Sequence, residues 1–188
     1  MPKQPATPAG QARNSSIDTA LLELMAEGAS LSHDAVAERS AVSRRTVYRR
    51  YPDKKALRLR VWHLLSSPQA FAYDLKQLLD HGLRRQFAGF DANAAAMTVS
   101  MASAEGRAMR NAVTRERIAY YRGLFEKELA DLPEPLRTQV VAALQMLCSG
   151  FAWREGRDRW DLDGEAVAQG CVWVIRAALA AARTAGPS

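Results

Sequence analysis

Apolar residues recur with helical spacing along almost the whole chain. Near the N-terminus they stand at positions i, i+4, i+7 and i+8, which is the stripe of an amphipathic helix. The residues of this stripe are Ile17, Leu21, Leu24 and Met25. Gly28 is expected to end that helix. Beyond residue 60 the helical pattern continues without strand-like alternation or an internal repeat, so the chain is predicted to be all-α.

A short second helix is predicted to begin after Ser32, whose hydroxyl suits an N-cap. Val36 and Ala37 face inward on this helix, and Ala41-Val42 forms a turn after it. Two short helices joined by a tight turn are the sequence pattern of a helix-turn-helix.

The helix after this turn is strongly basic. On a helical wheel of about 100° per residue, Val47 lies nearly opposite Arg45 and Arg49. One face therefore suits a core, and the other presents guanidinium groups, as a helix in a DNA major groove requires. We expect Ser43 to cap this helix and Asp53 to cap the next one.

The segment from Val42 to Leu57 contains six Lys or Arg residues and reads Val-Ser-x-x-Thr-x-Tyr-x-x-Tyr-x-x-Lys-x-x-Leu. This spacing resembles the signature of the tetracycline-repressor-like (TetR) family of bacterial regulators. The resemblance implies an N-terminal helix-turn-helix domain of three helices and a C-terminal helical domain for ligand binding and dimerisation. We predict a flexible arm at 1–13, the DNA-binding domain at 14–60 and the second domain at 61–188.

Three positions depart from the family pattern. Ala41 stands where glycine is usual, which costs on the order of 1 kcal/mol if the turn needs a positive φ. Arg45 replaces a residue that is often small and is expected to reach a base edge. His33 stands where an apolar residue usually packs under the second helix.

The basic helix supplies the predicted base contacts. Arg44, Arg45 and Arg49 are expected to enter the major groove, where Arg matches guanine O6 and N7. Thr46 is expected to touch a base methyl group or a phosphate. The predicted phosphate contacts, at helix N-termini or on the basic helix, are Ser32, Ser43, Tyr48 and Lys54.

The charge distribution agrees with a nucleic-acid module at the N-terminal end. The whole chain carries a formal charge of +6, of which residues 1–60 hold +5, with 11 Lys and Arg against 6 Asp and Glu. A solvated basic face would give the same excess, and only the helix-turn-helix spacing favours nucleic acid.

The resemblance also implies a small-molecule pocket in the middle helices. Met and aromatic side chains suit an apolar or aromatic ligand, with Arg117 or Arg122 for polar contacts. The same spacing fits an ordinary core, which we favour for most of them. The candidates are Phe87, Met97, Met101, Tyr120, Tyr121, Phe125 and Trp153.

The last two long helices carry apolar stripes that suit self-association. Two such helices from each of two subunits would form a four-helix bundle, and the family uses them in this way. Packing into the subunit's own core would give the same periodicity. The predicted interface residues are Leu136, Val140, Leu144, Cys148, Phe151, Val167, Cys171, Val174 and Ala178.

Beyond the first domain the breaks in the pattern, including one across 155–164, predict helices at about 54–66, 69–87, 91–104, 107–131, 134–153 and 164–184. Pro and Gly account for most of these breaks.

The sequence favours neither an enzyme nor a metalloprotein. The three histidines are scattered, and Cys148 and Cys171 lack metal-type spacing. We predict no catalytic residues, no metal and no cofactor. No uninterrupted run approaches the ~18–20 apolar residues of a membrane span, and no secretion signal precedes the first helix, so we predict a cytoplasmic protein without membrane contact.

The predicted function is that of a sequence-specific DNA-binding transcriptional regulator. As a homodimer it would bind a palindromic double-stranded operator, as a repressor released by an unidentified small-molecule effector. Two alternatives stay open: a DNA-binding regulator without an effector, and a protein that coats DNA without sequence preference.

Overall fold

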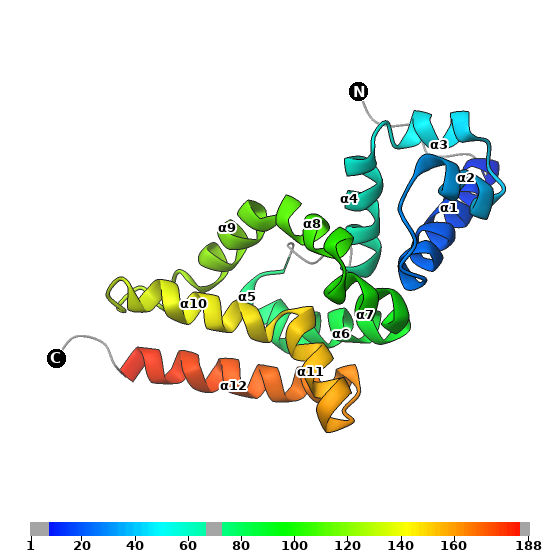
Figure 1. Cartoon of the computed structure of the whole chain (residues 1–188). Helices are drawn as coiled ribbons and strands as arrows, with labels where there is room; N and C mark the ends of the chain where they lie inside the picture. Colours follow the sequence, from blue (N-terminus) through cyan, green and yellow to red (C-terminus); the bar gives the residue numbers. More distant parts are fainter. Residues whose placement is uncertain (1–7, 67–72, 185–188) are drawn as a thin grey trace. The chain divides into compact units, whose positions relative to one another are not determined.

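The structure, a computed structural model, describes residues 8–66 and 73–184, and its account of side chains begins at Ser15 (Figure 1). Over these ranges the chain forms helices and connecting turns without any strand, which confirms the predicted all-α class. The described residues group into two compact units, and each unit is described by itself.

The first unit begins with four helices, which are α1 (Pro8–Ala26), α2 (His33–Ser40), α3 (Arg44–Arg50) and α4 (Lys54–Leu65). The stripe predicted for the first helix is buried, and α1 packs against α2 and α4. Helix α2 in turn packs against α3. The shared core contains Leu21, Leu31, Val36, Val47 and Leu57, each with no exposed surface.

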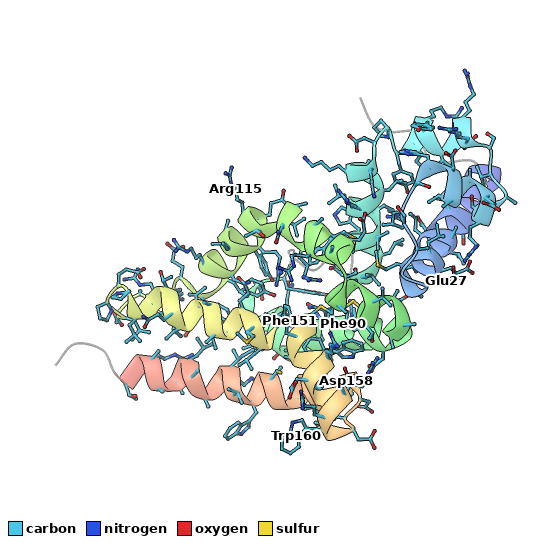
Figure 2. All side chains as sticks on the ribbon, in the orientation of Figure 1. Glu27, Phe90, Arg115, Phe151, Asp158 and Trp160 are labelled. Carbon is cyan, nitrogen blue, oxygen red and sulfur yellow. The ribbon has the colours of Figure 1, made fainter. Side chains whose placement is uncertain are left out.

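Ion pairs fix the outer surfaces of this unit. Arg60 on α4 holds both carboxylate oxygens of Asp18 on α1. Arg39 on α2 pairs with Glu23 and with Glu27, which projects from the C-terminal end of α1 in Figure 2. These three ion pairs connect α1 and the residue that follows it to α2 and α4.

Most of α7 (Ala94–Ala102) and α8 (Ala104–Ala112) also belongs to the first unit, which takes in residues 95–110. The two helices meet at a close approach, because a Cβ atom at Gly106 would overlap the backbone carbonyl of Ser100. Arg110 closes the same corner by donating to the Ser100 carbonyl at 2.6 Å.

The second unit contains a helix of three consecutive parts, α5 (Leu75–Gln77), the π-helical turn η1 (Leu78–Gly82) and α6 (Leu83–Ala92). Four further helices complete the unit. They are α9 (Thr114–Phe125), α10 (Leu136–Leu147), α11 (Gly150–Trp160) and α12 (Gly164–Thr184). Helix α12 packs against α6, α11 and α10, and in Figure 1 it runs alongside α10.

Asp91 ties three helices of the second unit together. One of its carboxylate oxygens accepts from Trp153 Nε1 on α11 and the other from the Gly164 amide at the start of α12, both at 2.7 Å. A Cβ atom at Gly164 would stand 2.6 Å from the Phe87 carbonyl oxygen, so glycine permits this approach.

Several predicted helix limits were wrong. The helix predicted over 107–131 is interrupted at Val113, and the predicted break near 105–106 lies earlier, where the Ser103 hydroxyl accepts from the Gly106 amide at the start of α8. Most of the segment 155–164, which was predicted as a break, is helical, because α11 runs to Trp160. Its polar residues form i,i+4 ion pairs, such as Arg154–Asp158, on an exposed helix face.

The predicted domain boundary at residue 60 stays a prediction, and the compact units divide the chain differently. Residues 95–110 group with the N-terminal helices rather than with the remainder of 61–188. Helix α1 begins at Pro8, inside the predicted arm, and residues 1–7 lie outside the described ones.

Helix α12 is long and apolar enough, by length and composition alone, to cross a membrane. Core helices of soluble proteins pass the same test, and α12 buries Val172, Ile175 and Leu179 inside its own unit. The apolar character of α12 is therefore explained in part by this packing.

The close approach of α7 and α8 predicts opposite effects for two Gly-to-Ala substitutions. Gly106→Ala places a methyl group on the Ser100 backbone and should lower the free energy of unfolding by about 3 kcal/mol. Gly89→Ala on α6 meets no atom within 4 Å and should raise this free energy by up to about 1 kcal/mol through helix propensity. Urea denaturation followed by circular dichroism measures both, and equal effects would contradict the close approach.

Candidate nucleic-acid interface

Side-chain caps define the N-termini of three consecutive short helices. Ser32, Ser43 and Asp53 each accept a hydrogen bond from the backbone amide three residues later, at 3.1, 3.3 and 2.7 Å. These caps confirm the three predicted helix starts. The N-terminus of a helix, with its unpaired amides, is a general binding site for anions such as phosphate.

The turn between α2 and α3 is tight and left-handed. Ala41 has φ 53° and ψ 27°, and its amide bonds back to the carbonyls of Ala37 and Glu38. The turn therefore does need a positive φ at position 41, where the family usually has glycine. The Cβ atom of alanine makes this left-handed conformation sterically less favourable than it would be for glycine.

Helix α3 is anchored by one side chain and exposes the others. Val47 has no exposed surface, whereas Arg44, Arg45, Tyr48 and Arg49 are all exposed. This arrangement confirms the two faces predicted from the helical wheel. The exposed face is dense in guanidinium groups and is suited to phosphates and base edges.

Arg44 is held in place by two partners. Its Nε lies 2.9 Å from Asp34 on α2, and its Nη2 donates to the Tyr48 hydroxyl at 3.4 Å. The hydrogen bond with Tyr48 and the charge of Asp34 raise the pKa of Arg44, which therefore stays charged. In contrast, Arg45 and Arg49 have no ion pair within the described part of the chain, so their guanidinium groups are available to a ligand.

Near the start of α4, as at Arg44, basic side chains are paired with a carboxylate. Glu105 on α8 accepts two hydrogen bonds from Arg58, at 2.7 and 3.0 Å, and its carboxylate lies 3.6 Å from Lys54 Nζ. The Arg58 guanidinium, with a smaller contribution from Lys54, holds the pKa of Glu105 below its usual value. Lys54 is therefore near a carboxylate that a DNA phosphate could replace.

All eight predicted DNA contacts lie in the first unit, at the start of α2, along α3 and at the start of α4. Their contact with DNA stays a prediction. Sequence reasoning missed Asp34 and Glu105 as partners of Arg44 and Lys54. Asp34 stands 10 residues from Arg44 and Glu105 51 residues from Lys54, so neither pair leaves a local sequence signal.

The seven predicted ligand contacts fall into separate groups. Phe87 and Trp153 both pack on Phe90, at ring distances of 5.5 and 5.8 Å, and Tyr121 stacks on Phe125 at 6.3 Å. Tyr120 is also in contact with Tyr121, whereas Met97 and Met101 belong to the other unit. The aromatic candidates thus lie in aromatic clusters of the second unit, and the ligand role of all seven residues stays a prediction.

The buried polar groups of the second unit are neutral and satisfied. Burial raises the pKa of Tyr120 to about 12 and also raises the pKa of Tyr121. Tyr120 donates to the Tyr73 carbonyl at 3.0 Å. Burial raises the pKa of Cys148 to about 12, so this thiol has little nucleophilic character at neutral pH.

One surface pocket of about 230 Å³ lies beside α9 and α10, lined by Phe125, Leu129 and Val141 together with Arg122, Glu134 and Arg137. It contains one of the predicted ligand contacts, Phe125, and one of the predicted polar groups, Arg122. The acidic and basic side chains at its edge suit a small polar molecule with an apolar part.

The predicted dimer residues divide by exposure. Leu144, Cys148, Val167 and Cys171 are buried inside their own unit, so their side chains already have an apolar environment. Leu136, Phe151 and Val174 are exposed, and Val140 and Ala178 are half-buried. Their role in an interface stays a prediction.

The exposed apolar surface of these helices includes two further residues that the sequence stripes did not contain. Met146 on α10 is 62% exposed and Trp173 on α12 is 73% exposed. The sequence analysis named neither residue, and a large exposed apolar side chain is unexpected on a monomer. The signal available in the sequence was a tryptophan that lies outside the apolar stripe of its helix.

No group of three or more His, Cys, Asp or Glu side chains in the described ranges could hold a metal ion. The three histidines lie apart in the chain, and His33 alone is buried. Its contacts are with aromatic residues of α3 and its C-terminal end rather than with carboxylates.

The geometry of α2, the left-handed turn and the exposed basic α3 defines a helix-turn-helix DNA-binding protein. A comparison with known families agrees, because residues 17–61 match the family model described as bacterial regulatory proteins, tetR family. No curated protein matches the chain. The chain is thus a DNA-binding transcriptional regulator that carries the N-terminal domain of the TetR family.

The left-handed turn predicts that glycine is the better residue at position 41. Ala41→Gly removes the steric cost of φ 53° at an exposed site and should raise the free energy of unfolding by up to about 1 kcal/mol. The matched change Ala119→Gly, on the exposed face of α9, should lower it by about 1 kcal/mol. Thermal unfolding compares the two, and a destabilised Ala41→Gly variant would contradict the argument.

Proposed function

We propose that this regulator is a homodimeric repressor that binds a palindromic operator and is released by a small-molecule effector. The observation that carries the DNA-binding part is the exposed face of α3, on which Arg45 and Arg49 are free of ion pairs within the described residues. Arg44, Arg45 and Arg49 contact bases in the major groove, and Thr46 contacts a base methyl group or a phosphate.

Backbone contacts surround this reading helix. Ser32 and Ser43 stand at the N-caps of α2 and α3, where backbone amides and side-chain hydroxyls meet phosphates. Tyr48 on α3 and Lys54 at the start of α4 complete the set. Lys54 exchanges its carboxylate partner Glu105 for a phosphate on binding.

Dimerisation is supported by the exposed apolar surface of α10 to α12. Leu136, Met146, Phe151, Trp173 and Val174 would each lose apolar contact with water in a symmetric four-helix interface. A two-fold dimer presents two reading helices to half-sites about 34 Å apart. This arrangement explains why a chain with one short basic helix would bind a palindrome.

The proposal of an effector is supported by the pocket beside α9 and α10, which Phe125 and Arg122 both line. Ligand binding would favour a dimer with a spacing of reading helices that misfits the operator. A ligand must prefer one state by several kcal/mol to shift the population decisively. Without such a ligand the protein would still be a regulator, controlled by its abundance or by another protein.

Binding to the DNA upstream of its own gene tests the proposal. The purified protein is titrated against that duplex and a scrambled duplex of equal length at two salt concentrations. Preference for the natural duplex at physiological salt, with a two-fold-symmetric footprint, supports the operator-binding regulator. Equal affinity for both, governed by salt alone, would favour the protein that coats DNA without sequence preference.

Substitutions on α3 and α4 should separate base contacts from phosphate contacts. Arg45→Ala should cost roughly 1–3 kcal/mol on the operator and relax the preference at one base position. Tyr48→Phe and Lys54→Ala should weaken binding to operator and scrambled duplex alike and reduce the salt dependence of the Kd. Fluorescence anisotropy measures these changes. Equal, sequence-independent losses for all three variants would remove the assignment of Arg45 to a base.

The exposed tryptophan of α12 should be required for the dimer. Trp173→Glu places a charge in the proposed interface and should shift the protein to monomers at micromolar concentration. Trp160→Glu is the matched control, since Trp160 is 72% exposed and lies at the last residue of α11, where Figure 2 shows it projecting outward. Sedimentation velocity distinguishes the two, and an intact dimer with Trp173→Glu would contradict the interface.

A further inference from the structure

His33 has an environment that differs from that of an ordinary core residue. It is the first residue of α2 and is only 9% exposed. Its ring lies almost parallel to the ring of Tyr48, with an interplanar angle of 3° and ring centroids 3.8 Å apart. Its Nε2 donates to the Tyr51 carbonyl at 2.6 Å. One imidazole therefore joins α2 to the middle and to the C-terminal end of α3.

The hydrogen bond fixes the plane of the imidazole. A carbonyl oxygen can only accept, so Nε2 carries the hydrogen in this contact. The Tyr51 amide is also bound, to the Val47 carbonyl at 2.8 Å, which holds the end of α3 in place. With its ring plane set by a backbone group, His33 offers Tyr48 a rigid aromatic surface on which to stack.

Tyr48 is partly exposed to solvent, and its ring orientation is set by few neighbours. It is 40% exposed on the basic face of α3, where its apolar contacts would otherwise be few. Its hydroxyl accepts a hydrogen bond from Arg44 Nη2 at 3.4 Å. A hydroxyl that accepts this hydrogen bond can still donate its own hydrogen. A phosphate oxygen, which only accepts, needs such a donor.

We propose that His33 is a positioning residue of the DNA-binding surface, which holds the Tyr48 ring in the orientation that presents its hydroxyl to a backbone phosphate. Because this orientation exists before DNA binds, less side-chain freedom is lost on binding. The inference rests on the proposed phosphate contact of Tyr48, and it assigns the unusual histidine of this chain a role in affinity beyond the packing of α2.

Substitutions at His33 separate the stack from the hydrogen bond. His33→Leu and His33→Phe both remove the bond to the Tyr51 carbonyl, but only phenylalanine retains a ring that can stack on Tyr48. His33→Gln retains an amide donor without a ring. His63→Leu, at an exposed position of α4, is the matched control.

Each full-length variant is titrated against the operator duplex and a scrambled duplex at low salt, at a temperature where unfolding curves show it folded. His33→Leu and His33→Gln should raise the Kd about two- to tenfold on both duplexes, the factor that the freezing of one side chain corresponds to. His33→Phe keeps the stacking ring but loses the bond that sets its plane, so it should raise the Kd less than His33→Leu does, and His63→Leu should change the Kd less than about twofold. The unfolding midpoint should fall for both His33→Leu and His33→Phe, because both lose the hydrogen bond.

The same substitutions are repeated with Tyr48→Ala. If His33 acts through Tyr48, His33→Leu should cost less than about twofold in that background. An undiminished cost there, or a Kd that follows the unfolding midpoint in all variants, would show that His33 only stabilises the fold. If Tyr48→Ala leaves the Kd unchanged, the positioning role is overturned while the function stands on Arg45. Failure of the wild-type protein to bind either duplex would instead remove the proposed function itself.

Discussion

The proposed DNA-binding surface depends on how a seven-residue helix, α3, is kept folded. A helix as short as α3 has almost no stability of its own, because nucleation is costly and few hydrogen bonds follow. Burial of Val47 and the Ser43 cap hold its start, and the Tyr51 amide holds its end. All other α3 side chains except the half-buried Thr46 are therefore exposed, and the helix can be dense in positive charge.

Two carboxylates partly neutralise the positive charge on this surface. Asp34 pairs with Arg44, and Glu105 pairs with Arg58 and lies near Lys54, which offsets the repulsion among closely spaced cations. Such exposed pairs contribute little to stability and are weakened by salt, so a polyanion can displace them at small cost. Arg45 and Arg49 need no such exchange. In the proposed interface, Arg45 and Arg49 can bind DNA directly, whereas Arg44 and Lys54 must first separate from a carboxylate.

The sequence predicted features that depend on neighbouring residues and missed those that depend on distant ones. The caps at Ser32, Ser43 and Asp53 follow from local backbone chemistry, whereas the positive φ of Ala41 was considered only as a condition. The pairing of Glu105 with Arg58 spans 47 residues and leaves no periodic signal. Helix α11 was missed because its i,i+4 ion pairs resemble a polar loop in composition. On α10 and α12, periodicity marked the apolar faces but could not separate the stripe that is buried from the one left outside.

The short helix α3 and the exposed apolar side chains of α10 and α12 both favour a dimer. In the proposed complex, Arg45 and Arg49 would give a single α3 only a few strong contacts, and immobilising the protein on DNA would offset much of their binding energy. A second α3 in the same particle avoids most of that cost, since its binding is intramolecular. In the proposed dimer, the exposed Trp173 and Met146 would supply apolar area between the two chains. Operator affinity and self-association are then linked by mass action, and whatever loosens the dimer also weakens the hold on DNA.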